Sequence, residues 1–291
     1  MKRRFKQVDV FTDRPFFGNP VAVVLDAVGL STADMQRIAH WTNLSETTFV
    51  VPTSQPGADY ALRIFTPASE LPFAGHPTIG SAHAVIEAGL VSSDTTRLVQ
   101  ECGAGLLAID VEAESNGRRK LFVTAPAVRF RAFDAAQADT LARALGAPIV
   151  GMPAIAAVGP VWLVVQLESG VAVESLRPDM PAIAALSARL ELTGITVFGT
   201  TSGGRDAIAV RSFAPAHGIV EDPVCGSGNI SVAAYLQRTG ALPDILPVYS
   251  ATQGGALGRD GHVSVRVDRN DNNSVRIGGY SVTCIDGSLD T

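Results

Sequence analysis

The sequence predicts an α/β protein of two pseudo-symmetric lobes, each a mostly antiparallel sheet wrapped around a central buried helix. Three observations support this prediction. At about 150 residues per domain, 291 residues suggest two domains. The hydrophobic content of 46% supplies enough apolar side chains for two packed cores. Finally, a turn followed by an apolar helix occurs twice in the chain, which indicates an internal duplication.

The repeat is clearest at the entrance of each apolar helix. A shift of 151 positions places residues 70–76 over residues 221–227. Upstream, after a small slip from this shift, Arg63-x-Phe65-x-Pro67 is echoed by Arg211-x-Phe213-x-Pro215. The coinciding pairs are Glu70/Glu221, Pro72/Pro223, Gly75/Gly226, Ile79/Ile230, Ala82/Ala233, Gly89/Gly240 and Gly103/Gly254. Because Gly and Pro constrain the backbone, matches at both ends of a helix favour two related structural units.

The first third of the chain has the pattern of short strands with interspersed helices. The predicted strands are Gln7–Thr12, Pro20–Leu25, Thr47–Val51 and Tyr60–Phe65, with the turn residues Gly18-Asn19-Pro20 between the first two. Ser31 and Asp34 provide N-cap and first-turn signals for a helix that runs to about Thr42. Residues 78–87 carry almost no charge, and a helix that is apolar on nearly every face is buried on nearly every face.

The second half repeats this arrangement. We expect strands at Lys120–Thr124, Val161–Gln166 and Ala207–Phe213. We expect helices at Ala135–Leu145, Pro181–Leu190 and Ile230–Leu236, the last of them apolar like the helix at residues 78–87. The sequence contains no low-complexity linker between the halves.

Charge and cysteine content exclude several classes of protein. With 23 basic against 28 acidic side chains the net charge is −5, so the chain is a poor ligand for the phosphate backbone of nucleic acids. Three cysteines without a Cys-x-x-Cys motif predict neither a disulfide framework nor a zinc site, and they favour a reducing, cytoplasmic compartment. The longest apolar stretch, 152–165, is interrupted and too short to span a bilayer. We therefore expect no membrane partner.

The two glycine-containing turns are candidate anion sites. Gly75 and Gly226 each lead into a buried helix, whose first amide groups and positive dipole end attract a carboxylate. If both entrances contribute to one site, it lies between the lobes. The alternative is that the glycines only permit tight turns and that Ser227 is an ordinary N-cap. Neither turn fits a nucleotide-binding motif, so no nucleotide is expected.

Titratable side chains surround these turns, and each has a functional and a structural interpretation. His76 lies at a helix entrance, and Asp222, before Pro223, is typical of a side chain that caps local backbone. Cys225 is either a small buried residue or, at a helix N-terminus, a thiol of lowered pKa that can act as base or nucleophile. From pattern alone Glu46 is a solvated side chain. His76 and His83 share a helix face, but no third ligand accompanies them, so no metal is expected.

With these residues in place, the chain resembles the PhzF-like family, named for an isomerase of phenazine biosynthesis, and its fold resembles that of diaminopimelate epimerase. The resemblance covers essentially the whole chain in family order. It rests on residues 8–11, 18–23, 43–50, 63–67, 70–78 and 221–228, which read VDVF, GNPVAV, NLSETTFV, RIFTP, ELPFAGHPT and EDPVCGSG.

The resemblance implies roles for individual residues. Glu46 matches the acid/base glutamate of the family. His76, Asp222 and Ser227 match polar groups that hold the substrate in the cleft between the lobes. It also implies lobes at residues 1–118 with 276–291 and at 119–275, a homodimer, and no cofactor.

The chain departs from its relatives at the helix entrances. Cofactor-independent epimerases of this fold use two facing cysteines, whereas this chain has Ala74 at the first position and Cys225 at the second. Two-thiol epimerisation is therefore not supported. Cys225 also replaces the small residue, often Thr, that is expected in PhzF-like proteins.

Three functional hypotheses follow. The first is an isomerase that moves a proton on a small carboxylate-bearing substrate, with Glu46 as the shuttle and with Ser227 and the amides of Gly75, Gly226 and Gly228 as anion ligands. The second is a one-thiol racemase or epimerase that uses Cys225 with Glu46 or Asp222. The third is a non-catalytic binding protein of the same fold. Fold alone does not identify the substrate.

Overall fold

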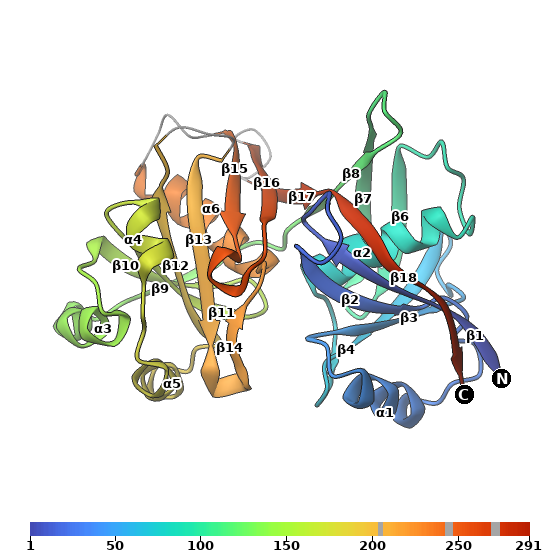
Figure 1. Cartoon of the computed structure of the whole chain (residues 1–291), viewed down its shortest axis with the longest axis horizontal. Helices are drawn as coiled ribbons and strands as arrows, with labels where there is room; N and C mark the ends of the chain where they lie inside the picture. The colour runs from blue at the N-terminus through green and yellow to red at the C-terminus, as the bar shows by residue number, and fades with distance from the viewer. Residues whose placement is uncertain (203–205, 242–246, 269–273) are drawn as a thin grey trace. The chain divides into compact units, whose positions relative to one another are not determined.

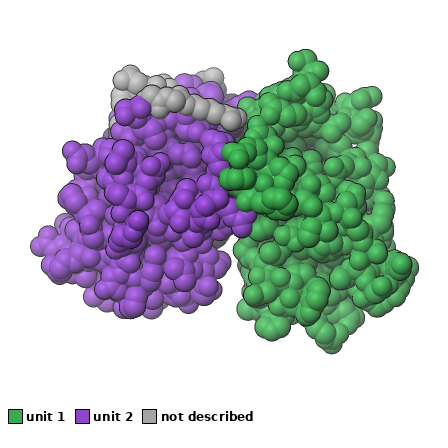
Figure 2. All heavy atoms as spheres, in the orientation of Figure 1, with its two compact units in different colours: residues 1–124, 278–291 green, residues 125–277 purple. Residues whose placement is uncertain are grey.

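The computed structural model describes residues 1–202, 206–241, 247–268 and 274–291. The chain forms two compact units: unit 1 comprises residues 1–124 and 278–291, and unit 2 comprises residues 125–277 (Figure 2). Strand β8, Arg119–Thr124, belongs to unit 1, so the chain leaves unit 1 after residue 124 and not after residue 118. It returns within strand β17, Ser274–Gly279.

Unit 1 is a sheet wrapped around helix α2. Its strands follow one another in the order β18-β1-β2-β3-β4-β6-β7-β8, with the short β5 beside β4. The β2–β3 and β4–β6 pairs are parallel and the others are antiparallel. The bounds are β1 Lys2–Val10, β2 Asn19–Val24, α1 Thr32–Thr42, β3 Thr47–Val51, β4 Tyr60–Phe65, β5 Glu70–Leu71, α2 Gly75–Glu87, β6 Arg97–Cys102, β7 Gly105–Ala113 and β18 Ser281–Asp290. Helix α2 contacts β1, β2, β3, β8 and β18 and is buried along most of its length (Figure 1).

Unit 2 repeats this topology around helix α6. Its strands run in the order β9-β10-β11-β12-β13-β15-β16, with β14 beside β13. The two parallel pairs, β11–β12 and β13–β15, correspond to β2–β3 and β4–β6 of unit 1. The bounds are β9 Arg129–Ala132, α3 Ala138–Leu145, β10 Val150–Ala157, β11 Val161–Gln166, α4 Gly170–Ser175, α5 Met180–Arg189, β12 Gly194–Thr200, β13 Ile208–Ala214, β14 Ile219–Asp222, α6 Gly226–Thr239, β15 Val248–Gln253 and β16 Gly261–Asp268. The predicted fold class is thus confirmed in each unit.

An ion pair is repeated together with the topology. Arg63 on β4 binds both carboxylate oxygens of Glu70 at 2.7 Å. In unit 2, Arg211 on β13 binds both oxygens of Glu221 at 2.8 Å. The pairs differ in burial, because the side chains of Arg211 and Glu221 are 8% and 5% exposed against 30% and 39% for Arg63 and Glu70. Two equivalent bidentate pairs on equivalent strands support the duplication inferred from the sequence.

Both central helices begin earlier than the apolar pattern predicted. Helix α2 starts at Gly75 and not at Thr78, and α6 starts at Gly226 and not at Ile230. The first residues of a helix have no intrahelical partner for their amide hydrogens, so glycine and proline are tolerated there. Pro77 accordingly lies inside the first turn of α2. This correction makes His76 and Ser227 the second residues of their helices.

The remaining helices cover the outer faces of the sheets. In unit 1, α1 packs on β3 and β4 over a small core that includes Phe49 and Phe65, whose rings meet edge to face at 5.5 Å. In unit 2, α3, α4 and α5 cover β12, β13 and their neighbours over a larger aliphatic core. Within the described ranges, no helix is long and apolar enough to cross a membrane.

Candidate active site

Glu46 and His76 meet in unit 1. Glu46 immediately precedes β3, and its Oε2 lies 3.3 Å from Nε2 of His76, the second residue of α2. Their side chains are only 15% and 7% exposed. The pattern-based expectation of a solvated Glu46 is therefore wrong. Glu46 is buried by packing against α2, which is distant in the chain. The local sequence around Glu46 therefore has no apolar periodicity that would indicate this burial.

Burial changes the acidity of Glu46. Removal from water disfavours the carboxylate and raises its pKa to about 7, while a hydrogen bond with Ser45 acts in the opposite direction and is smaller. A carboxyl group with a pKa near 7 exists in both protonation states near neutral pH. Such a group can both accept a proton and return it near neutral pH.

Asn19 is a neighbour of this pair that the sequence analysis treated only as a turn residue. It is 1% exposed at the start of β2, and its Nδ2 lies 3.5 Å from His76 Nδ1. When the amide donates to Nδ1, the neutral ring carries its proton on Nε2, the nitrogen that lies 3.3 Å from Glu46 Oε2. The signal that could have revealed this role is the Gly18-Asn19-Pro20 motif itself.

The predicted residues of unit 2 meet at the N-terminus of α6. Cys225 is the N-cap, and its Sγ accepts the amide hydrogen of Gly228 at 3.2 Å. Ser227 is consequently not the N-cap. Its Oγ accepts a hydrogen bond at 2.9 Å from the indole Nε1 of Trp162 on β11 and lies 3.5 Å from Cys225 Sγ. Sequence reasoning missed Trp162, because it belongs to a strand pattern 65 residues earlier.

Asp222 shows the backbone-capping geometry that its position before a proline predicts. Its Oδ1 accepts the amide hydrogen of Val224 at 3.1 Å, and its carbonyl accepts a hydrogen bond from Gln253 at 3.0 Å. Gln253 in turn accepts from buried Asn229 at 3.0 Å. This chain of hydrogen bonds fixes the turn that leads from β14 into α6.

Gly226 and Gly228 are the first and third residues of α6. A Cβ atom at Gly228 would lie 2.6 Å from Ser212 Oγ and 3.1 Å from Thr196 Oγ1, so close packing on β12 and β13 requires glycine there. The corresponding glycine in unit 1, Gly75, opens α2 beside His76. The structure thus brings Gly75, His76 and Glu46 together in unit 1, and the remaining predicted residues together in unit 2.

Cys225 is less acidic than its helix-terminal position suggested. The residue is 2% exposed, and burial raises the pKa of its thiol well above the ordinary value; the negative charge of Asp222 acts in the same direction. Of the two interpretations of Cys225, the small buried residue therefore fits better than the thiol of lowered pKa, because loss of hydration outweighs the helix N-terminus. A thiol in this state is a weak nucleophile and a weak base.

A labelling experiment tests this state of Cys225. We expect iodoacetamide at pH 7.5 to leave Cys225 unmodified in the native protein and to alkylate it after denaturation in urea, as read by peptide mass spectrometry. Cys102 and Cys284 are half-buried internal references. Rapid alkylation of native Cys225, prevented by a carboxylate ligand, would instead favour the one-thiol hypothesis.

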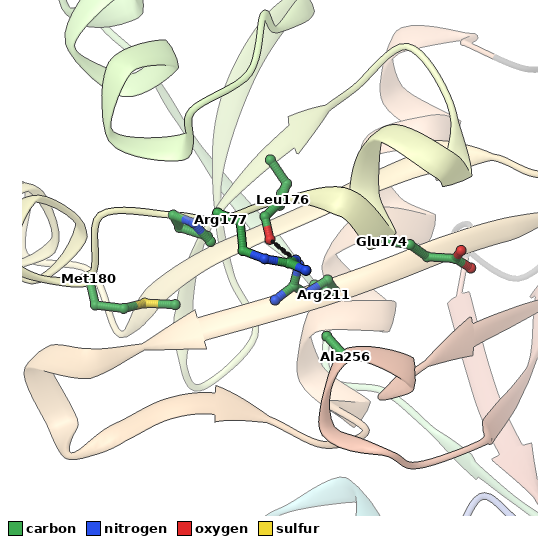
Figure 3. A pocket seen from close by; sticks show the side chains of 7 residues that line it. Glu174, Leu176, Arg177, Met180, Arg211 and Ala256 are labelled. Atoms are coloured by element: carbon green, nitrogen blue, oxygen red, sulfur yellow. Dashed lines mark hydrogen bonds between the residues drawn. The ribbon is translucent and has the colours of Figure 1, made fainter.

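A cavity of about 510 Å³ lies elsewhere in unit 2 (Figure 3). It is lined by Glu174, Leu176, Arg177, Pro178, Met180, Arg211 and Ala256. The Arg211 guanidinium donates to Leu176 O at 3.0 Å and is held by Glu221, so its charge is already neutralised. None of the predicted site residues lines this cavity. In the described part of the chain, no cluster of three His, Cys, Asp or Glu side chains could hold a metal ion.

Comparison with known proteins places this chain in a family. The phenazine biosynthesis-like protein family, PhzC-PhzF, matches residues 8–287. The chain is 40% identical over 290 residues to "Antisense-enhancing sequence 1" of Schizosaccharomyces pombe, with 97% of both chains covered. It is 36% identical over 253 residues to the trans-2,3-dihydro-3-hydroxyanthranilate isomerase of Pseudomonas fluorescens, with 87% of this chain and 86% of that protein covered.

A solved structure extends the match to the entire fold. A PhzF-family phenazine biosynthesis protein from Bacillus anthracis superposes with a TM-score of 0.88 at 27% identity, and all of both chains is covered. Further relatives in Clostridium acetobutylicum and Salmonella typhimurium are named as isomerases. The chain therefore belongs to the phenazine biosynthesis-like family, and its enzyme class is that of a PhzF-like isomerase.

Proposed function

We propose that this chain is a cofactor-independent isomerase that moves a proton on a small carboxylate-bearing substrate, with Glu46 as both acid and base. The observation that carries the proposal is a buried carboxyl group with a pKa of about 7, 3.3 Å from a buried imidazole. A catalytic group whose pKa lies near the working pH offers both the basic form that removes a proton and the acidic form that returns it.

The proposed substrate class is an unsaturated cyclic amino acid with a hydroxyl group, because one relative is named trans-2,3-dihydro-3-hydroxyanthranilate isomerase. In the proposed step, the Glu46 carboxylate removes a proton from a carbon activated by the conjugated double bonds. The electron pair moves through the conjugated system, the double bonds shift, and a second carbon receives the proton from Glu46. One proton leaves and one returns, so the reaction is balanced without a redox partner.

Binding of the substrate is assigned to polar groups at both helix entrances. In this proposal His76 orients the substrate beside Glu46, and Asp222 contacts a polar substituent. Ser227 and the backbone of Gly75, Gly226 and Gly228 bind the carboxylate or the negative charge that develops during proton transfer. Independence of metals and organic cofactors is part of the proposal, as are the homodimer and the cytoplasmic location implied by the family resemblance.

Proton NMR in D2O tests the proposed reaction. Wild-type protein and Glu46→Gln are incubated side by side with trans-2,3-dihydro-3-hydroxyanthranilate and with saturated cyclic amino acids as controls. We expect a double-bond shift, with deuterium entering the product, in the wild type alone and only with the unsaturated compound. Equal conversion by the two proteins would overturn the role of Glu46, and conversion by neither would overturn the substrate class.

A further inference from the structure

The duplication allows residues of one unit to be matched with residues of the other. Phe65 and Phe213 occupy equivalent places on β4 and β13, and they pair with Thr47 and Ile195. The residue before Thr47 is Glu46, and the residue before Ile195 is Gly194. By the same comparison, His76 and Ser227 are the second residues of α2 and α6. Unit 2 thus has a glycine where unit 1 has its buried carboxyl group.

Gly194 cannot accept a side chain without movement of the backbone. A Cβ atom there would lie 2.1 Å from the carbonyl oxygen of Phe213 and 2.8 Å from Cζ3 of Trp162. Trp162 is the partner of Gly194 in the parallel β11–β12 pair. The indole therefore packs against the glycine, close to where a side chain equivalent to Glu46 would begin.

In unit 2 the indole contacts the second residue of the central helix, as Glu46 does in unit 1. Glu46 lies 3.3 Å from His76, and Trp162 Nε1 donates to Ser227 Oγ at 2.9 Å. Trp162 is 3% exposed, so its ring is held by packing. An indole N–H is only a donor and does not titrate, so Ser227 Oγ must be the acceptor of this hydrogen bond.

This contact leaves the Ser227 hydroxyl hydrogen to be directed elsewhere. One neighbour of Ser227 Oγ is Cys225 Sγ at 3.5 Å, a long contact in which either atom can be the donor. Ser227 is partly exposed, in contrast to Trp162 and Cys225. Its hydroxyl hydrogen can therefore be donated to a bound anion.

We propose that Trp162 is a positioning residue, which holds the Ser227 hydroxyl so that it donates its hydrogen to the substrate carboxylate. Gly194 is the residue that makes room for the indole. Unit 2 then has no carboxyl group at the position equivalent to Glu46, and the hydroxyl group of Ser227 serves there as a neutral ligand for an anion. This inference rests on the proposed function. It assigns binding of the substrate carboxylate to one group, the hydroxyl of Ser227.

Nuclear magnetic resonance can observe this hydrogen bond directly. The chain has two tryptophans, and Trp41 is 75% exposed, so Trp41→Phe leaves Trp162 as the only source of an indole N–H signal. We expect Ser227→Ala in this background to move the Trp162 Nε1–H resonance upfield and to accelerate its exchange with solvent. We also expect 3-hydroxyanthranilate, used as a non-reacting probe, to move the resonance when Ser227 is present. An unmoved resonance in both experiments would overturn the proposal.

Steady-state kinetics separates positioning from packing. Trp162 is replaced in the Trp41→Phe background by 3-benzothienylalanine, which has the shape of tryptophan but a sulfur atom in place of the N–H. We expect KM for the dihydro-hydroxyanthranilate to rise about tenfold, the effect of one hydrogen bond to a charged group, and kcat to change less than twofold. The same replacement in Ser227→Ala should leave KM unchanged relative to Ser227→Ala alone. Trp41→Phe itself is the matched control and should behave as wild type.

The two measurements distinguish failure of this inference from failure of the proposed function. Turnover of the dihydro compound with an unchanged KM after sulfur replacement would overturn the role of Trp162 and leave the isomerase intact. An equal rise of KM with and without Ser227 would show that the indole acts through packing, which also overturns it. No turnover, together with a probe-dependent shift of the Trp162 resonance, would overturn the reaction but support the anion ligand.

Discussion

Glu46→Gln is expected to lower kcat by about 10³-fold, within the range that general acid–base groups contribute. The amide keeps nearly the same shape and polarity as the protonated carboxyl group, so the fold and ligand binding should persist. Rates are measured under saturating dihydro-hydroxyanthranilate, and circular dichroism monitors the fold. Glu46→Asp, which keeps the acid but shortens it by one methylene, should retain more activity than Glu46→Gln. Full activity of Glu46→Gln would contradict the assignment.

The pH dependence of the wild type follows from the same group. In the proposed mechanism the ionised form of Glu46 removes the first proton, so kcat/KM should increase as the pH rises through about 7, the pKa of this buried group. An increase centred near 4.5, the value of an exposed glutamate, would show that Glu46 is not buried during the reaction. The profile is measured with the dihydro compound between pH 3.5 and 9, together with a control of enzyme stability at each pH.

Glu46→Gln should also stabilise the folded protein at alkaline pH. Since the folded pKa of Glu46 lies above its unfolded value, the carboxyl group favours folding most below pH 4.5, and this contribution is lost as the pH rises to about 7. The shift from 4.5 to about 7 corresponds to about 3 kcal/mol, which is an upper value because the side chain is 15% exposed. Glu46→Gln removes the penalty of a buried charge.

Urea denaturation of wild type and Glu46→Gln at pH 5 and pH 8.5 checks this expectation. The free-energy difference in favour of the variant should be larger at pH 8.5. The exposed Glu174→Gln serves as control and should show no such pH dependence. A free-energy difference between variant and wild type that does not grow from pH 5 to pH 8.5 would exclude a raised pKa at this position.

The second large effect is expected at the buried ion pair of unit 2. Glu221→Ala should lower the free energy of unfolding by about 3–5 kcal/mol, because it leaves the Arg211 guanidinium buried without its carboxylate. Two backbone carbonyls, of Val173 and Leu176, still accept from Arg211, but they carry no net charge. The effect is measured by urea denaturation followed by circular dichroism.

Unit 1 supplies the matched control. Glu70→Ala breaks the equivalent pair with Arg63, where both side chains remain substantially exposed to water and the expected loss is at most about 1 kcal/mol. The contrast between these variants isolates burial, since both pairs have the same bidentate geometry. Equal losses would show that burial does not determine the energy of this repeated contact.

The local sequence predicts those features of the fold that a residue imposes on its own backbone. Gly75, Gly226 and the prolines around them mark the helix entrances, because these residues permit or restrict dihedral angles wherever they occur. Because these residues recur at a constant spacing of 151 positions, the sequence alone indicates two related units. The strands Thr47–Val51, Tyr60–Phe65 and Val161–Gln166 have the predicted bounds, since β-branched and aromatic runs favour extended structure.

Which side chains meet depends on the packing of segments that are distant in the chain. The local sequence describes Glu46 as a solvated residue, and its burial and raised pKa follow from packing beside His76, which is 30 residues away. Likewise, the contact of Trp162 with Ser227 depends on the β11–β12 register and on the missing side chain of Gly194. The physical reason is that propensity acts over a few neighbouring residues, whereas desolvation and hydrogen bonding depend on what sheet pairing and helix packing bring into contact.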